Sequence, residues 1–145
     1  MRRIALLLAA LVIYGLVPVI AQGPVTPAAP VTSVVFNGST PLLPKRIIVD
    51  TATNGDTEVI AGVSSRRIRV LALFLTMTGT AVTIRFEDTR AGTALTGQMT
   101  PSQGQTIVLP FNPVGWFQTT AGNSLNLELG GGQSVDGAIT YVEVP

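Results

Sequence analysis

The chain has 145 residues and a formal net charge of +1, and it contains neither cysteine nor histidine. This composition excludes disulfide bonds, thiol nucleophiles, histidine-based acid–base catalysis and the usual zinc sites. Charged residues make up only 12% of the chain and hydrophobic residues 46%, so we expect one folded domain with a sizeable core. The sequence has no basic block and no basic stripe interleaved with aromatic residues, so we expect no nucleic-acid partner.

Residues 1–21 have the layout of an export signal peptide. A short basic start is followed by an apolar segment, residues 4–21, whose end at Val19 and Ala21 is an acceptable cleavage site that would leave Gln22 as the new N-terminus. The alternative is a retained N-terminal membrane anchor, because a segment of this length reaches the lower limit for crossing a bilayer. Either outcome sends the rest of the chain across a membrane, and a retained segment would also contact that membrane.

Residues 22–31 form a Pro-rich linker in which proline recurs at every third position. This spacing favours the extended polyproline II conformation and leaves little local packing. The segment is either a stiff spacer that holds the following domain off a surface or an arm that docks on a neighbouring subunit. Residues 32–145 are expected to form the folded domain.

From residue 31 onward, short strand patterns alternate with turn residues, and no convincing helical periodicity is present. The expected strands are Val31–Phe36, Arg46–Thr51, Thr57–Val63, Arg67–Met77, Ala81–Glu87, Thr93–Gln98, Thr106–Leu109, Gly115–Thr119, Ser124–Leu129 and Gly137–Val144. This pattern predicts an all-β fold, an antiparallel β-sandwich or jelly-roll-like domain.

Three of these strands carry more specific patterns. In residues 81–87 and 124–129, apolar residues alternate with polar ones, as expected for half-buried sandwich strands. The apolar sets are Val82, Ile84 and Phe86 in the first strand and Leu125, Leu127 and Leu129 in the second. Arg67–Met77 is apolar on both faces, so it is either a central strand or one whose outer face is covered by another chain.

Residues 109–117 hold the only tryptophan, two of the five phenylalanines and two of the ten prolines. Two X–Pro steps exclude a helix and a central strand here, so we expect a rigid corner. Phe111, Trp116 and Phe117 could form a sugar-stacking platform on the surface. Because the chain has few aromatic residues, we expect these three to fill the core instead.

Acidic residues offer two candidate sites. Four oxygen-bearing residues around an Asn-Gly turn could hold calcium, but their spacing is not that of an EF-hand, and a hairpin with solvated acids explains them equally well. They are Asp50, Asn54, Asp56 and Glu58. The adjacent Glu87 and Asp88 should point to opposite faces of a strand and therefore not form an acid pair. We expect no metal site and no cofactor.

No catalytic constellation is evident in the sequence. The serines have no histidine base, and the single lysine, Lys45, is far from them in sequence, so a triad hydrolase is excluded. Asn37-Gly38-Ser39 matches a glycosylation sequon only as a weak three-residue pattern, and the glycines at 130–132 lack the lysine and helix of a phosphate loop. We expect no enzymatic activity and assign no catalytic residue.

Five blocks of the sequence, taken in order, carry a family resemblance. They are Arg67–Leu73, Thr93–Gly97, Ile107–Phe117, Leu125–Leu127 and Thr140–Val144. Their order resembles a small β-module common among bacteriophage structural proteins, in particular capsid decoration and fibre-type domains. The resemblance implies a virion-associated β-sandwich subunit that packs against itself or against other shell proteins.

We therefore expect a structural or assembly protein, either virion-associated or exported, that forms homo-oligomers or packs on other virion or surface proteins. The alternative is an exported cell-surface adhesion or carbohydrate-binding module, or a surface-filament subunit. A carbohydrate-binding module predicts that Trp116 or Phe117 is exposed to solvent.

Overall fold

The computed structural model describes residues 34–79, 83–131 and 134–145. The leader and linker predicted for residues 1–31 lie outside these ranges, as do Ala81 and Val82 at the start of one expected strand. In the described part of the chain every regular element is a β-strand, and no helix is long and apolar enough to cross a membrane. The predicted all-β fold is confirmed.

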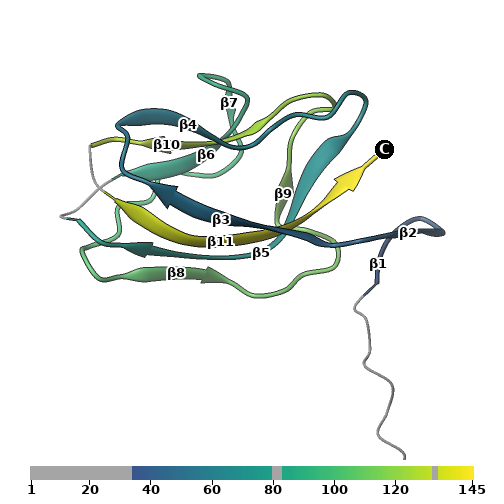
Figure 1. The fold of residues 1–145 in the computed structure, drawn as a ribbon, viewed down its shortest axis with the longest axis horizontal. Helices are drawn as coiled ribbons and strands as arrows, with labels where there is room; N and C mark the ends of the chain where they lie inside the picture. The colour runs from purple at the N-terminus through teal and green to yellow at the C-terminus, as the bar shows by residue number, and fades with distance from the viewer. Residues whose placement is uncertain (1–33, 80–82, 132–133) are drawn as a thin grey trace, which may run out of the picture. The chain divides into compact units, whose positions relative to one another are not determined.

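The strands form two layers, which Figure 1 shows one above the other. One sheet has the order β3-β11-β5-β8, with β9 also paired to β5, and the other has the order β4-β10-β6-β7; β1 and β2 form a separate hairpin. All pairs are antiparallel, and successive strands from β3 to β6 alternate between the sheets, as in a jelly roll. The strands are β1 (Val35–Asn37), β2 (Thr40–Leu42), β3 (Lys45–Thr51), β4 (Gly55–Ile60), β5 (Arg67–Met77), β6 (Ile84–Asp88), β7 (Thr93–Ala94), β8 (Thr106–Leu109), β9 (Phe117–Gln118), β10 (Leu125–Leu129) and β11 (Val135–Val144).

The structure changes a few of the expected strand bounds. β5 and β8 have the predicted limits, whereas β7 and β9 are only two residues long. The sequence did not predict β2, because this strand contains Pro41, which has no backbone N–H to donate to a sheet. Proline is tolerated here because β2 pairs with β1 alone and is therefore an edge strand.

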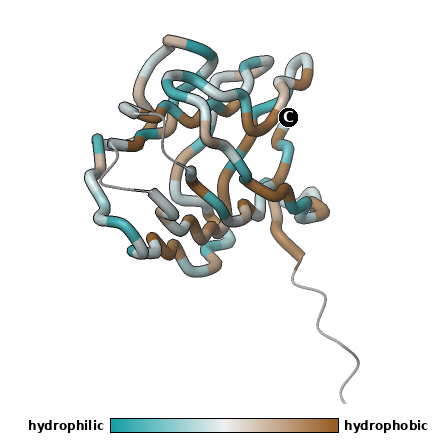
Figure 2. Tube along the Cα trace, turned by 60° about the vertical axis from the view of Figure 1, so that its left-hand side comes forward, coloured by the Kyte–Doolittle hydropathy of each residue, from teal (hydrophilic) through white to brown (hydrophobic). Residues whose placement is uncertain are grey.

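The main core lies between the two sheets. Most of it comes from the apolar faces of β5, β6, β10 and β11, with one residue each from β3 and β4. Its members are Val49, Ile60, Ile68, Val70, Leu73, Leu75, Met77, Ile84, Phe86, Leu125, Leu127, Leu129, Val135 and Ile139. Figure 2 shows hydrophobic and hydrophilic residues following one another along much of the trace, as expected for strands with one face in a core. The alternation predicted for residues 81–87 and 124–129 is therefore confirmed within residues 84–87 and 125–129.

A second, smaller core explains why β5 is apolar on both faces. The register between β5 and β11 shifts at Thr140 and Tyr141, so Leu71 has no partner in the ladder. Leu71 packs instead with residues of the β1–β2 hairpin and the end of β11, namely Val35, Leu42, Val142 and Val144. β5 is also central, with β11 on one side and β8 and β9 on the other.

Candidate functional site

Backbone hydrogen bonds to strand β5 fix the corner at residues 109–117. The Asn112 N–H donates to the Leu71 carbonyl at 2.8 Å, and the Trp116 N–H donates to the Val70 carbonyl at 2.9 Å. The loop between these two anchors therefore cannot move away from β5 without breaking both bonds. The predicted rigid corner is present.

The Asn112 side chain closes the turn from within. Its Nδ2 donates to the Gly115 carbonyl at 3.0 Å. Gly115 has a φ of +91°, and a Cβ at this position would lie 2.4 Å from Arg69 Cγ. Only glycine fits this combination of backbone conformation and close contact.

The prediction that the corner's aromatic residues fill the core is wrong for two of the three. Phe111 is 47% exposed and Trp116 is 45% exposed. Phe117 is half-buried, and its ring centroid lies 5.1 Å from that of Phe86. The Trp116 indole N–H donates to the Pro110 carbonyl at 2.8 Å, and this bond ties the ring to its own loop.

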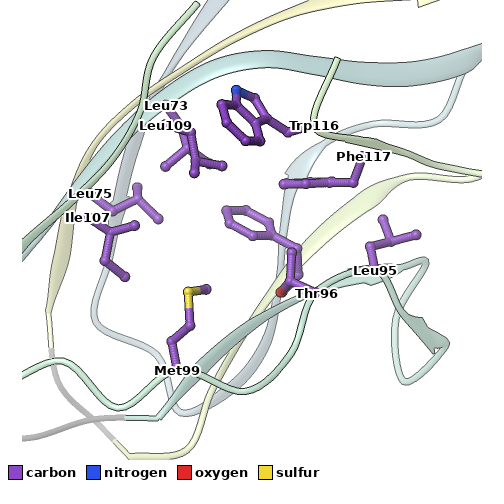
Figure 3. Close-up of a pocket in the computed structure, with 10 residues that line it drawn as sticks. Leu73, Leu75, Leu95, Thr96, Met99, Ile107, Leu109, Trp116 and Phe117 are labelled. Atoms are coloured by element: carbon purple, nitrogen blue, oxygen red, sulfur yellow. The ribbon is translucent and has the colours of Figure 1, made fainter. Parts of the chain in front are cut away.

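A cavity of about 240 Å³ opens between the sheets beside Trp116 (Figure 3). Figure 3 shows Trp116 and Phe117 on one side and Met99 on the opposite side. The lining is almost entirely apolar: Leu73, Leu75, Phe86, Leu95, Thr96, Met99, Ile107, Leu109, Trp116 and Phe117. The Thr96 hydroxyl already accepts the Phe86 N–H at 3.0 Å, and the indole N–H is also occupied. The cavity therefore suits an apolar group better than a sugar.

The outer face of the β3-β11-β5-β8 sheet carries a row of apolar side chains across all four strands. Ala138 of β11 is in register with Ile48 of β3 and with Phe74 of β5, and Phe74 is in register with Val108 of β8. Ile48 is 75% exposed, Val108 62% and Phe74 44%. Phe111 from the corner joins Phe74 and Val108 in lining a shallow groove beside this row. We call Ile48, Ala138, Phe74 and Val108 the apolar row.

Charged residues lie in the two neighbouring rows of the same face. On one side Asp50 of β3 is directly opposite Asp136 of β11, an unfavourable pairing of like charges. On the other side Arg46 of β3 is opposite Thr140. Among the described residues, Arg46 forms no ion pair. The face is thus negative at one end and positive at the other.

The structure divides the residues that the sequence grouped as a possible calcium site. Asp50 lies in β3, whereas Asp56 and Glu58 lie in β4 of the other sheet. Asp56 meets two acids from strands that are distant in sequence, Glu87 of β6 and Glu128 of β10. We call these three residues the acidic cluster.

The acidic cluster lies on the outer face of the β4-β10-β6-β7 sheet, and each of its residues brings one oxygen within 4.8 Å of the others. Nη2 of Arg85 lies 2.6 Å from Glu87 Oε1, and Nε of Arg85 contacts Glu128. The Ala91 N–H donates to Asp56 Oδ2 at 2.9 Å. Burial raises the pKa of Glu87, and the neighbouring Asp56 raises it further while Arg85 opposes both effects.

Asp88 is separated from Glu87 in the way the sequence predicts. Its carboxylate accepts the Thr120 N–H at 3.1 Å and the Thr120 hydroxyl, and so ties the end of β6 to the loop before β10. Glu87 contacts Arg85 and the other acids instead. The two adjacent acids therefore do not act as a pair.

Comparison with known proteins gives one structural likeness. Neither a protein-family model nor a curated protein sequence matches the chain. A solved structure described under the words "Bacillus endospore appendages form a novel family of disulfide-linked pili" shares 16% sequence identity, with a TM-score of 0.47, over 75% of this chain and 92% of that chain. The present chain has no cysteine, so it cannot form the disulfide links named there. The resemblance to bacteriophage virion modules is not supported by these comparisons.

Proposed function

We propose that this chain is an exported structural subunit whose β-domain associates with copies of itself, as in a surface filament or coat, and that it has no enzymatic role. The observation that carries this proposal is the apolar row, which crosses the whole outer face of the β3-β11-β5-β8 sheet. The export-type N-terminal sequence and the lack of cysteine and histidine support it.

The apolar row gives a physical reason for association. The outer face of an antiparallel sheet that contacts water is normally polar, whereas Ile48, Phe74 and Val108 are exposed in one row, with the buried Ala138 between Ile48 and Phe74. Fully burying a side chain of this size contributes roughly 1.5–3 kcal/mol. Contiguous exposed apolar groups rimmed by polar residues are typical of interaction surfaces.

The charges on either side of the row fit a second copy of the same chain. A twofold axis along the row, in the plane of the interface, reverses the strand direction of the partner copy. Arg46 of one copy then lies over Asp50 of the other, and the like-charged pair of Asp50 and Asp136 gains a cation. The face is therefore self-complementary in both apolar area and charge.

A single-cysteine crosslinking experiment tests this arrangement, because the natural chain has no cysteine. In the full-length Ile48→Cys variant the two introduced sulfurs should lie across the axis from each other. Face-to-face sheets are about 10 Å apart, which exceeds the reach of a disulfide, so a short bismaleimide is the suitable reagent. We expect a crosslinked dimer with Ile48→Cys and none with Thr93→Cys, which places the thiol on the opposite sheet.

Light scattering after size-exclusion chromatography provides the second measurement. The unmodified chain should elute as a dimer or a larger oligomer. A stable monomer at high concentration, together with equal crosslinking of both cysteine variants, would refute self-association through this face.

A carbohydrate-binding module is the second candidate, and the exposure of Trp116 and Phe111 favours it. The lining of the neighbouring cavity is mostly apolar, and its indole N–H is already bonded within the loop, so few groups remain for sugar hydroxyls. Trp116 is the only tryptophan, so its fluorescence reports directly on this site. A saturable emission change with a soluble glycan, lost in Phe111→Ala, which keeps the Trp116 reporter, would support this function over self-association alone.

A further inference from the structure

Asn126 is a buried polar residue next to the acidic cluster. It lies in β10 between the core residues Leu125 and Leu127, so its side chain points to the outer face of the sheet, as that of Glu128 does. Its cross-strand partner in β6 is Glu87. Asn126 is 1% exposed, yet neither its Oδ1 nor its Nδ2 has a hydrogen-bond partner within the described residues. A buried amide without a partner is costly, so it is the kind of group that binds a ligand.

Several carboxylate oxygens of the acidic cluster also lack hydrogen bonds, although Arg85 forms ion pairs with two of its acids. Glu87 is 1% exposed, and neither of its carboxylate oxygens has a hydrogen bond in the described part of the protein; Asp56 Oδ1 also has none. Arg85 approaches Glu87 and Glu128, but its Nε has no hydrogen bond of acceptable geometry. Three carboxylates against one guanidinium leave two negative charges uncompensated, so the cluster attracts a cation.

We propose that Asp56, Glu87, Glu128 and Asn126 form a binding site for Ca²⁺ on the outer face of the β4-β10-β6-β7 sheet. Calcium takes six to eight oxygen ligands at about 2.3–2.6 Å, so two ligands of one ion lie at most about 5 Å apart. The carboxylate oxygens of the cluster meet this condition, since they lie within 4.8 Å of one another. The Asn126 carbonyl adds the neutral oxygen that such sites commonly include, and water completes the shell.

Arg85 takes the role of an exchangeable counter-ion in this site. Its side chain is 40% exposed, whereas that of Glu87 is 1% exposed, so the guanidinium can turn into solvent while the glutamate stays in place. Binding of Ca²⁺ then replaces one positive charge by two. Calcium is favoured over Mg²⁺, because Mg²⁺ demands a near-ideal octahedral shell and keeps several of its waters.

Isothermal titration calorimetry of the full-length chain, after chelator treatment, tests the site directly. We expect one Ca²⁺ per chain, with a dissociation constant of about 10⁻⁵–10⁻³ M, and weaker binding of Mg²⁺. The melting temperature should rise with Ca²⁺, because the ion binds only the folded chain. No saturable Ca²⁺ binding up to about 10 mM, well above the weakest affinities of extracellular calcium modules, would overturn the proposal.

Charge-removing variants locate the ion. Glu87→Gln and Glu128→Gln keep the side-chain shape and should each weaken Ca²⁺ binding at least tenfold; Glu128 is 34% exposed, so its variant is the less disruptive to folding. Asp50→Asn, from the group that the sequence singled out, should bind Ca²⁺ like the unmodified chain. If Asp50→Asn abolishes binding while both Gln variants retain it, the ion is elsewhere and the proposal fails.

An added carboxylate gives a test with the opposite sign. Asn126→Asp should tighten Ca²⁺ binding, since it supplies a fourth anionic ligand, and should lower the melting temperature of the chelator-treated chain. A variant that binds Ca²⁺ no better than the unmodified chain would contradict the placement of Asn126 in the site.

Discussion

The two outer faces of the sandwich use the same strand geometry but expose opposite kinds of side chain. On the β3-β11-β5-β8 sheet, Ile48, Phe74 and Val108 are open to solvent. On the β4-β10-β6-β7 sheet, the polar side chains of Glu87 and Asn126 are buried. Exposed apolar groups in a row and buried polar groups without partners are the two informative departures from ordinary burial. The first face is thus suited to another protein surface and the second to a small cation.

Replacing an arginine by methionine on each face should give the largest difference in the free energy of unfolding. Arg85→Met removes the only cation that contacts the acidic cluster within the described residues and leaves Glu87 buried with uncompensated charge. Breaking a buried ion pair is strongly destabilising, and because Arg85 is partly exposed we expect a loss of about 2–3 kcal/mol of unfolding free energy in chelator. Arg46→Met on the open face should change it by less than about 0.5 kcal/mol.

Urea unfolding of both variants, with and without Ca²⁺, is the measurement. Ca²⁺ should recover most of the loss in Arg85→Met, since the ion neutralises the same carboxylates. Equal losses in the two arginine variants would show that the faces do not differ in the way inferred.

The sequence predicts most of the strands and their core-facing sides well, because this information lies in local alternation. The two-residue period of a strand is enough to place Ile84 and Phe86 on one face of β6 and Arg85 on the other. It likewise separates the three leucines of β10 from Asn126. The sequence did not predict β2, because proline is tolerated only in an edge strand and Pro41 lies within β2. Whether a strand lies at an edge depends on which strands pair. The sequence also did not predict the exposure of Trp116, because this depends on the hydrogen bond from the indole to the Pro110 carbonyl, which holds the ring beside the cavity.

The acidic cluster could not be predicted from local sequence pattern, because its residues come from three strands. Alternation places Glu87 and Glu128 on the polar side of their own strands, but only the order β4-β10-β6 brings them to Asp56. The sequence grouped Asp50 with Asp56 because they are close in the chain, whereas the crossover from β3 to β4 puts them in different sheets. The apolar row likewise depends on register, since its four members come from four strands.

A substitution in the corner at residues 109–117 should have an intermediate effect on the free energy of unfolding. Gly115→Ala puts a side chain at φ +91° and within 2.4 Å of Arg69 Cγ, so we expect a loss of about 1–2 kcal/mol of unfolding free energy. Gly104→Ala is the matched control, because its φ is +77° but nothing lies within 4 Å of the added methyl. Thermal unfolding of both variants separates the contact with Arg69 from the backbone cost that they share. Equal losses would mean that Arg69 simply moves aside.

Substitutions in the apolar row should have the smallest effect on the free energy of unfolding. A small effect on unfolding together with a large effect on association would identify the row as an association surface. The double variant Ile48→Thr and Val108→Thr keeps β-branched side chains that suit strands, and both positions are mostly exposed, so the monomer should lose less than about 0.5 kcal/mol. The same change removes apolar area from an interface in which each side chain contributes roughly 1.5–3 kcal/mol when buried. Association should therefore weaken by at least about tenfold, measured by sedimentation equilibrium. A variant that unfolds earlier but associates as before would assign the row to the stability of the single domain.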